Sequence, residues 1–382
     1  MAASAVRWVL PAVLMLVLAA LLPPVSWAVA SMSGSGAGSD VVATGSPVRS
    51  MAGTFVSLKP PCSCSSTAVI ERYSLRTGAP LRAVATVTGP GSSTLQTDEH
   101  GELWVTTTTG PRYVSPVAGG DPQPNTCTGN LTRYDPLTGT SHTVLRFPTS
   151  ELVGAAVPSP TGDEVALLAG GCNTSYFNQH VIVEDLRTGR TVQIGAGATP
   201  CHDLFHVAWS PDGSTLLFPY GPSVLPATTS FVPHGTCIAP RWGRLAIVSA
   251  RHSSNPGGWR LIDPPAHCSY VAAAFDRAGI LAAAACTSGD PPGFSGSPQL
   301  GDAFLVQLSP RGRSLLRLPL AHGFNNGNVV SNPLTGQVLI SEEQAAHTGH
   351  RVYDRVWSFD RDRLHLVGRY EPSSPSVTAL PW

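Results

Sequence analysis

Short apolar runs separated by polar turns recur along the whole chain. Between residues 207 and 218, the run Val207–Trp209 is followed by Ser-Pro-Asp-Gly and then by the run Thr215–Phe218. Proline fixes φ, aspartate can hydrogen-bond to the backbone and glycine accepts a positive φ, so this tetrapeptide predicts a tight turn. Two apolar runs of strand length joined by such a turn predict a β-hairpin.

Weaker copies of this hairpin recur, and residues 207–218 belong to a set of five hairpins of one type. A second hairpin type lies between them, with turns such as Asp-Pro-Leu-Thr-Gly and Asp-Leu-Arg-Thr-Gly. Glycine ends most of the turns in both types, which indicates that the turns need a positive φ. The glycines of the further copies are Gly101, Gly162, Gly279 and Gly336 in the first type, and Gly78, Gly139, Gly189 and Gly312 in the second.

The alternation of the two hairpins predicts a four-stranded antiparallel unit of roughly 50–60 residues, a little longer than common propeller repeats. One such unit cannot bury both of its faces, but units arranged radially bury one another, so we predict an all-β fold, a β-propeller of about six blades. The first unit lacks an obvious first strand, and residues 376–382 form one spare strand. We expect this tail to close the ring as the inner strand of the first blade, which removes an open sheet edge. The alternative is a disordered tail.

The segment Ala208-Trp-Ser-Pro-Asp-Gly-Ser-Thr-Leu-Leu-Phe218 resembles the repeat signature of TolB-like propellers, which are WD-like in shape. With its partial copies, the resemblance extends over residues 52–382. The turn is structural in that family. The resemblance therefore implies a propeller fold and an interaction surface, and it implies no catalytic residues.

The N-terminus has the pattern of a secretory signal. Arg7 precedes an apolar run over residues 8–22, and Ala28-Val29-Ala30 offers the small residues that a signal peptidase reads. We expect a signal peptide over residues 1–30, cleaved after Ala30, with an uncleaved membrane anchor as the alternative. Residues 31–50 are rich in Ser and Gly and predict a flexible spacer. Residues 51–382 are then a single propeller domain of a secreted or envelope-associated protein.

Composition narrows the partners. The formal net charge is zero and 13% of the residues are charged, so nothing favours nucleic acid or an anionic membrane surface. Membrane contact is expected only through an uncleaved signal segment, and we expect a monomer. One lysine among many arginines, with heavy use of Ala, Gly and Pro, is typical of a bacterium with a GC-rich genome.

The chain has eight cysteines, and an even number in an exported protein predicts disulfides. In a propeller, the connections after the second and fourth strands of each blade lie on one face, and the strand assignment puts all eight cysteines there. Cys268 and Cys286 flank one hairpin and should lie within bridging distance. Cys201 and Cys237 occupy the analogous positions one blade earlier. Sequence cannot connect the remaining four, and a redox or metal role for the first two is the less favoured alternative: Cys62, Cys64, Cys127 and Cys172.

Candidate ligand-binding residues gather on the same face. His202 and His206 are four residues apart, which places them on one side of a strand, and we expect them near the top of an inner strand, facing the central channel. A ring of His, Asn and acidic residues around a channel could hold a metal or a polar ligand. No zinc-type spacing is present, and solvated loop histidines are the favoured alternative. The other members of this ring are Asp203, Glu151, His234, His267, His322, Asn325 and Asn326.

Motifs of common catalytic classes are missing from the sequence. There is no Gly-x-Ser-x-Gly elbow, no phosphate-binding glycine loop and no dinucleotide fingerprint. Asp98, Glu99 and His100 look like an acid–base cluster, but they fall in a hairpin turn on the opposite face, where a solvated turn is expected.

Three functions follow from these patterns. The leading hypothesis is an exported, non-enzymatic propeller that binds a protein, a glycan or an envelope component through its disulfide-rich face, with no cofactor. The first alternative is a metal-dependent propeller enzyme of the lactonase or lyase type, with a divalent metal in the channel held first by His202, His206 and Glu151. The second alternative is a structural scaffold without a small ligand.

Overall fold

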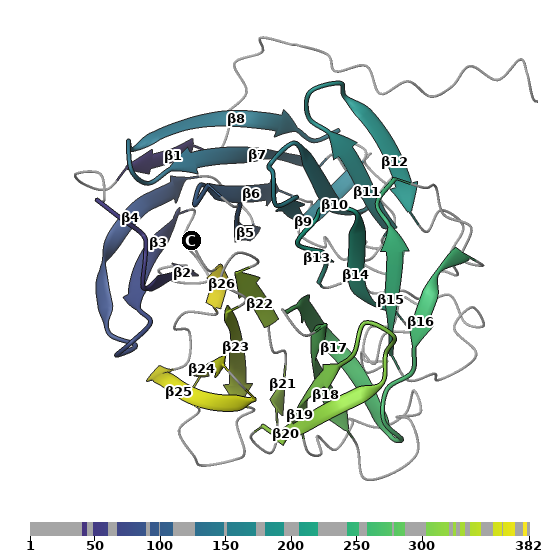
Figure 1. The fold of residues 1–382 in the computed structure, drawn as a ribbon. Coiled ribbons are helices and arrows are strands. Elements are labelled where there is room, and N and C mark those ends of the chain that lie inside the picture. The colour runs from purple at the N-terminus through teal and green to yellow at the C-terminus, as the bar shows by residue number, and fades with distance from the viewer. Residues whose placement is uncertain are drawn as a thin grey trace, which may run out of the picture.

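The strands of the computed structural model form six sheets arranged in a ring (Figure 1). The expected six-bladed β-propeller is therefore confirmed. None of the described residues forms a helix of the length and apolar character that crossing a membrane requires. The structure describes residues 40–43, 49–59, 67–88, 92–98, 100–109, 127–148, 151–172, 180–194, 206–220, 243–251, 258–276, 279–286, 303–320, 324–325, 329–332, 337–344, 354–360, 362–370 and 377–379.

Each blade is an antiparallel sheet, and its strands follow one another from the channel outwards. Blade 1 holds β26 (Val377–Ala379), β2 (Thr54–Lys59), β3 (Thr67–Ser74), β4 (Pro80–Thr88) and β1 (Asp40–Ala43). Blade 2 holds β5 (Ser92–Thr97), β6 (Leu103–Thr109), β7 (Thr128–Asp135) and β8 (Thr140–Arg146). Blade 3 holds β9 (Glu151–Pro158), β10 (Glu164–Gly171), β11 (His180–Asp185) and β12 (Arg190–Ile194).

The second half of the ring repeats this order. Blade 4 holds β13 (Ala208–Trp209), β14 (Thr215–Tyr220), β15 (Arg244–Ser249) and β16 (Arg260–Ile262). Blade 5 holds β17 (Cys268–Phe275), β18 (Ile280–Cys286), β19 (Ala303–Leu308) and β20 (Ser314–Pro319). Blade 6 begins with β21 (Phe324–Asn325) and β22 (Val329–Asn332), which both pair with β23 (Gln337–Gln344), and continues with β24 (Asp354–Asp360) and β25 (Arg363–Tyr370).

A small polar residue closes the turn between the first two strands of a blade. Its side-chain oxygen accepts a hydrogen bond from a backbone amide on the far side of the turn, which satisfies a donor that the hairpin leaves unpaired. The bonds run from Glu102 N to Asp98 Oδ1 (3.0 Å), from Glu164 N to Ser159 Oγ (3.1 Å), from Thr215 N to Ser210 Oγ (2.9 Å) and from Gly279 N to Asp276 Oδ1 (2.6 Å). The turn glycines that the structure describes have positive φ in both hairpin types, as expected: Gly78, Gly101, Gly139, Gly162, Gly189, Gly213, Gly279 and Gly312.

The C-terminal strand closes the ring, as predicted. β26 pairs antiparallel with β2, with Ala379 opposite Val56, and so becomes the innermost strand of blade 1 (Figure 1). Blade 1 thus combines the two ends of the described chain, because β1 forms its outermost strand.

The structure differs from the expected flexible spacer at residues 40–43, which form β1. Val41 lies opposite Val87 of β4 and is 5% exposed, and its carbonyl accepts a 2.9 Å hydrogen bond from Ser141 Oγ of blade 2. Two β-branched residues in a row can pair and bury apolar surface on a sheet edge. In the sequence, the strand preference of these four residues is hidden by the Ser- and Gly-rich stretch around them, because the segment is so short.

The core consists of the interfaces between neighbouring blades. Between blades 3 and 4, for example, Leu168 and Val183 pack in one cluster with Trp209 and Phe218. Small residues dominate the inner two strands of blade 5, where residues 272–274 and 282–284 are all alanine and all buried. Blades converge towards the axis of a propeller, so small inner side chains allow the sheets to approach there.

Candidate functional site: the loop face

The two ends of the ring differ in their connections. We call the end that carries the hairpin turns inside the blades the turn face, and the end with the connections after second and fourth strands the loop face. On the turn face, β7 ends at Asp135 and β8 begins at Thr140. On the loop face, three connections are far longer: Thr109 to Thr128, Tyr220 to Arg244, and Cys286 to Ala303. Long connections on a rigid scaffold are where binding residues concentrate.

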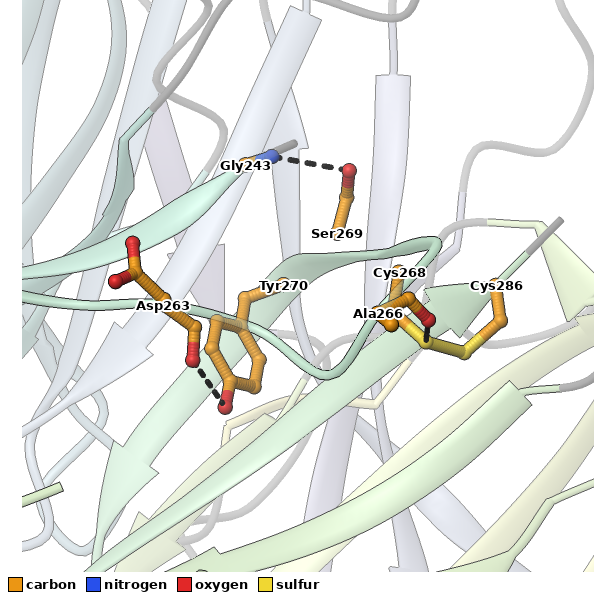
Figure 2. Close-up of a disulfide and its surroundings, with 7 residues drawn as sticks. All are labelled: Gly243, Asp263, Ala266, Cys268, Ser269, Tyr270 and Cys286. Carbon is orange, nitrogen blue, oxygen red and sulfur yellow. Dashed lines mark hydrogen bonds between the residues drawn. A yellow bond between two sulfur atoms is a disulfide. The ribbon is translucent and has the colours of Figure 1, made fainter. Parts of the chain in front are cut away.

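The Cys268–Cys286 disulfide lies on the loop face (Figure 2). The two cysteines are directly opposite each other on β17 and β18, with their Cα atoms 3.9 Å apart. This is the pair that the hairpin register predicted. The bond ties the inner strand of blade 5 to the second strand at the point where both reach the loop face.

A second disulfide joins Cys127 to Cys172, a pairing that the sequence left open. Cys127 directly precedes β7 of blade 2 and Cys172 directly follows β10 of blade 3. The bond therefore holds two neighbouring blades together, also at the loop face. The remaining cysteines, Cys62, Cys64, Cys201 and Cys237, lie outside the described residues.

Hydrogen bonds next to Cys268 connect blades 4 and 5. Ser269 Oγ accepts a 3.0 Å bond from the amide of Gly243, which directly precedes β15, and Tyr270 Oη donates to the carbonyl of Asp263 at 3.5 Å (Figure 2). Burial, followed by the nearby charge of Asp263, raises the pKa of Tyr270 to about 12. The phenol stays protonated at neutral pH and acts as a donor that positions the connection between β16 and β17.

This connection presents polar groups at the surface. The side chain of Asp263 is 82% exposed, and its carboxylate lies 3.9 Å from Arg244 Nη1. His267 is exposed and has a φ of 61°, in a turn where the amide of Cys268 donates to the carbonyl of Pro265 at 3.1 Å. A positive φ outside glycine persists where the surroundings determine it. The disulfide that follows fixes the end of this turn, so His267 is displayed in a defined position.

His206 lies in a different place. It precedes β13 and lines a cavity in the central channel, whose other lining residues belong to the ends of inner strands near the turn face. Its Nε2 is inaccessible to solvent and has no hydrogen-bond partner among the described residues. Burial lowers the pKa of His206 to about 4, and a hydrogen bond with the backbone of Ala273 opposes this shift. The imidazole is therefore neutral at neutral pH. It lines this cavity away from the loop face, and a ligand-binding role for it stays a prediction.

The proposed ring of ligands is described only in part. Glu151 is the first residue of β9 and Asn325 the last of β21, and the structure describes only the backbone of both. His267 is not among the residues that line the cavity at His206. Among the residues that the structure describes, no group of three or more His, Cys, Asp and Glu side chains could hold a metal ion. Five candidates lie outside the described residues: His202, Asp203, His234, His322 and Asn326.

Asp98 on the turn face is not the solvated turn residue that was expected, because the hairpin buries its carboxylate. It is 1% exposed, and its carboxylate accepts bonds from the amides of His100 and Glu102 and from Trp104 Nε1 at 2.9 Å. These donors occupy its oxygens inside the hairpin turn. Glu99 lies outside the described residues.

Sequence reasoning missed the hydrogen bonds that connect blades 4 and 5 at the loop face. Ser269 and Tyr270 follow Cys268 directly, and that adjacency was the available signal. Their partners, Gly243 and Asp263, belong to the preceding blade, so the contacts depend on how the blades dock. The same holds for Gln96 and Ser331, which line the channel cavity and carry no motif.

Comparison with known proteins adds a fold-level likeness. No family model matches the chain, and no curated protein matches it. A putative 6-phosphogluconolactonase from Bacteroides uniformis is 12% identical, with 83% of this chain and 82% of that chain covered and a TM-score of 0.47. A hydrazine synthase chain from Kuenenia stuttgartiensis is 15% identical, with 87% and 91% covered and a TM-score of 0.44. A prolyl endopeptidase is 10% identical with a TM-score of 0.37, and the match covers 83% of this chain but 36% of that longer chain. At such identities and TM-scores, these likenesses carry no conclusion about this chain.

Proposed function

We propose that this protein is an exported, non-enzymatic binding propeller that contacts a large partner through its loop face. The observation that carries the proposal is the position of the two described disulfides, which both reinforce that face. A surface held in its binding geometry before the partner arrives loses less conformational entropy on association. The long connections that begin and end on the same face offer many positions for recognition residues.

The disulfides also support export. Disulfides persist in oxidising compartments and are rare in the cytosol. The signal pattern that ends at Ala30 also supports export. The repeat signature in residues 208–218 supports kinship with TolB-like propellers. We therefore propose a protein, a glycan or another component of the cell envelope as the partner, with the propeller acting as a monomer.

Crosslinking from the two faces tests the proposal. A photo-crosslinking amino acid replaces either Asp263, which is exposed on the loop face, or Arg311, which is exposed in the β19–β20 turn on the turn face. We expect a discrete adduct with one partner from position 263 and none from position 311, in cells that secrete the protein. Equal adducts from both positions, or an adduct from position 311 alone, would reject the loop face as the contact surface.

Native mass spectrometry of the secreted protein tests the remaining parts. We expect the mass of a chain that begins after Ala30. Before reduction this mass should be lower by eight hydrogens, which corresponds to four disulfides from eight cysteines. A chain that retains residues 1–30 would contradict release by signal cleavage. A stoichiometric metal in the native protein would instead favour the metal-dependent enzyme.

A further inference from the structure

We infer that the turn-face end of the channel is a binding site for a small, uncharged polyhydroxyl group, with Gln96 and Ser331 as its polar contacts. Neither the loop face nor the disulfides take part in this site, so the inference does not depend on the function proposed above.

The cavity is built by the inner strands of five blades. Thr97, Pro158 and Trp209 are the last residues of β5, β9 and β13, and each of them lines it. Ala274 of β17 and Ser331 of β22 contribute from the last two blades. Because every inner strand runs towards its hairpin turn, these residues gather at the turn-face end of the channel.

The size of the cavity limits the ligand. Its volume is about 60 Å³. Since one water-sized group needs roughly 10–15 Å³, the cavity has room for about four to six such groups. A three- or four-carbon polyol, or one edge of a sugar ring, has this size.

Two side chains provide the polar contacts. Gln96 and Ser331 are partly buried and line the cavity. The amide offers donors and an acceptor, and the hydroxyl offers one of each. Polar groups in a confined site normally find partners. Hydroxyl groups of a ligand match both side chains, because each hydroxyl also donates and accepts.

Most of the remaining wall is apolar and held in place. Pro158, Pro160, Val330 and Trp209 also line the cavity. The indole Nε1 of Trp209 donates to the carbonyl of Val157 at 2.9 Å, so the ring orientation is set without the ligand. Such surfaces pack against the C–H groups of a polyol or a sugar.

The lining residues are uncharged at neutral pH. None of them is Asp, Glu, Lys or Arg, and His206 is the one titratable residue among them. Burial holds the pKa of His206 at about 4, so it stays neutral. A charged ligand would lose part of its hydration here without a compensating charge, which is unfavourable. The site therefore selects uncharged hydroxyl-bearing groups.

Ligand-observed NMR by saturation transfer on the folded, full secreted chain tests the inference. The probes are glycerol, methyl α-D-glucopyranoside and the charged analogue glycerate. We expect saturable binding of a neutral probe, unchanged between pH 5.5 and pH 8, and no binding of glycerate. Preferred binding of glycerol indicates a free polyol as the ligand, and preferred binding of the glucoside indicates the end of a glycan.

Substitutions locate the binding. Gln96→Leu and Ser331→Ala should each weaken the neutral probe about three- to tenfold, the loss expected for one hydrogen bond. Gln193→Leu is the control, because Gln193 is exposed on the outer strand β12, and it should leave binding unchanged. Circular dichroism checks that each variant is folded, and Ser331→Ala remains informative if Gln96→Leu does not fold. Absence of saturable binding, equal binding of glycerate, or equal effects of the control and the cavity variants would overturn the inference.

Discussion

The indole Nε1 of Trp209 donates a 2.9 Å hydrogen bond to the carbonyl of Val157, and this bond connects blade 4 to blade 3. Val157 lies on the inner strand β9, whose channel side has no neighbouring strand, so its carbonyl needs a partner from outside its own sheet. The tryptophan of the Trp-Ser-Pro-Asp-Gly segment therefore has two roles. Its ring fills the interface between the blades, and its Nε1 provides a hydrogen-bond partner for the carbonyl of Val157 on an inner strand.

Trp209→Phe should lower the free energy of unfolding by about 1–3 kcal/mol, because it leaves the carbonyl of Val157 without its partner. Trp259→Phe is the matched control. The Nε1 of Trp259 is buried and has no partner among the described residues, and its ring makes edge contacts with Phe218 and Tyr220 that phenylalanine can retain. Urea unfolding of both variants measures the difference. A larger loss for Trp259→Phe would contradict the role given to the Trp209 bond.

Removal of one disulfide or of the other should lower the free energy of unfolding by different amounts. Cys127 and Cys172 are 45 residues apart, whereas Cys268 and Cys286 are 18 apart. If a crosslink acts mainly on the unfolded chain, the double alanine variants lose about 4 and about 3 kcal/mol, respectively. Urea midpoints and slopes of the two variants test this order. The reverse order would mean that local packing at blade 5 outweighs the entropy of the unfolded chain.

Two glycines with positive φ should differ in their tolerance of alanine. Gly53 has a φ of 68° and open space around it, so Gly53→Ala should cost about 1–2 kcal/mol for the backbone conformation alone. Gly279 has a φ of 153°, and a Cβ there would clash with the carbonyl oxygen of Leu308 and lie 3.2 Å from Pro310. Gly279→Ala should lower the free energy of unfolding by about 1–3 kcal/mol more than Gly53→Ala does. Thermal unfolding of the two variants measures this difference. Equal losses would contradict the tight approach of the two hairpins.

Glu184 should make stability depend on pH. It lies on β11 opposite Val165, is 9% exposed, and burial raises its pKa from 4.5 to about 7. Between these values the folded state holds a proton that the unfolded state releases, so the stability contributed by the protonated carboxyl is lost as the pH rises from 4.5 through 7.

Glu184→Gln should therefore match the wild type near pH 4 and exceed its free energy of unfolding by about 3 kcal/mol at pH 8. Urea unfolding across this pH range measures the difference. Asp360→Asn, at an exposed position, is the control for removal of a carboxylate charge. A gain for Glu184→Gln that is already complete at pH 4 would show that the charge of Glu184 is not its cause.

The hairpins could be predicted because their determinants are local. Ser210 bonds across a turn of five residues, and the positive φ of Gly213 is a property of the residue type itself. The closing strand could also be predicted, because the first blade lacked an inner strand and the C-terminal segment lacked a partner. Pairing the segment with that blade supplies what each of them lacks. The Cys268–Cys286 bond followed from the same hairpin register.

The features between blades could not be predicted in this way. The Cys127–Cys172 bond joins blades 2 and 3, and the bond from Ser141 to the carbonyl of Val41 joins blades 2 and 1. In both cases the separation along the chain says nothing about the contact. Of the expected ligand residues, His206 does face the channel, but the structure places it with Gln96 and Ser331, which no motif marks.

The sequence by itself determined the repeating unit, an approximate number of blades and the way in which the ring closes, because turn chemistry and the alternation of apolar runs act over a few neighbouring residues. Only the tertiary structure decided which side chains meet across the blades and around the axis. Those contacts depend on the docking angle and spacing of whole sheets, to which many weak packing interactions contribute and no single residue is decisive.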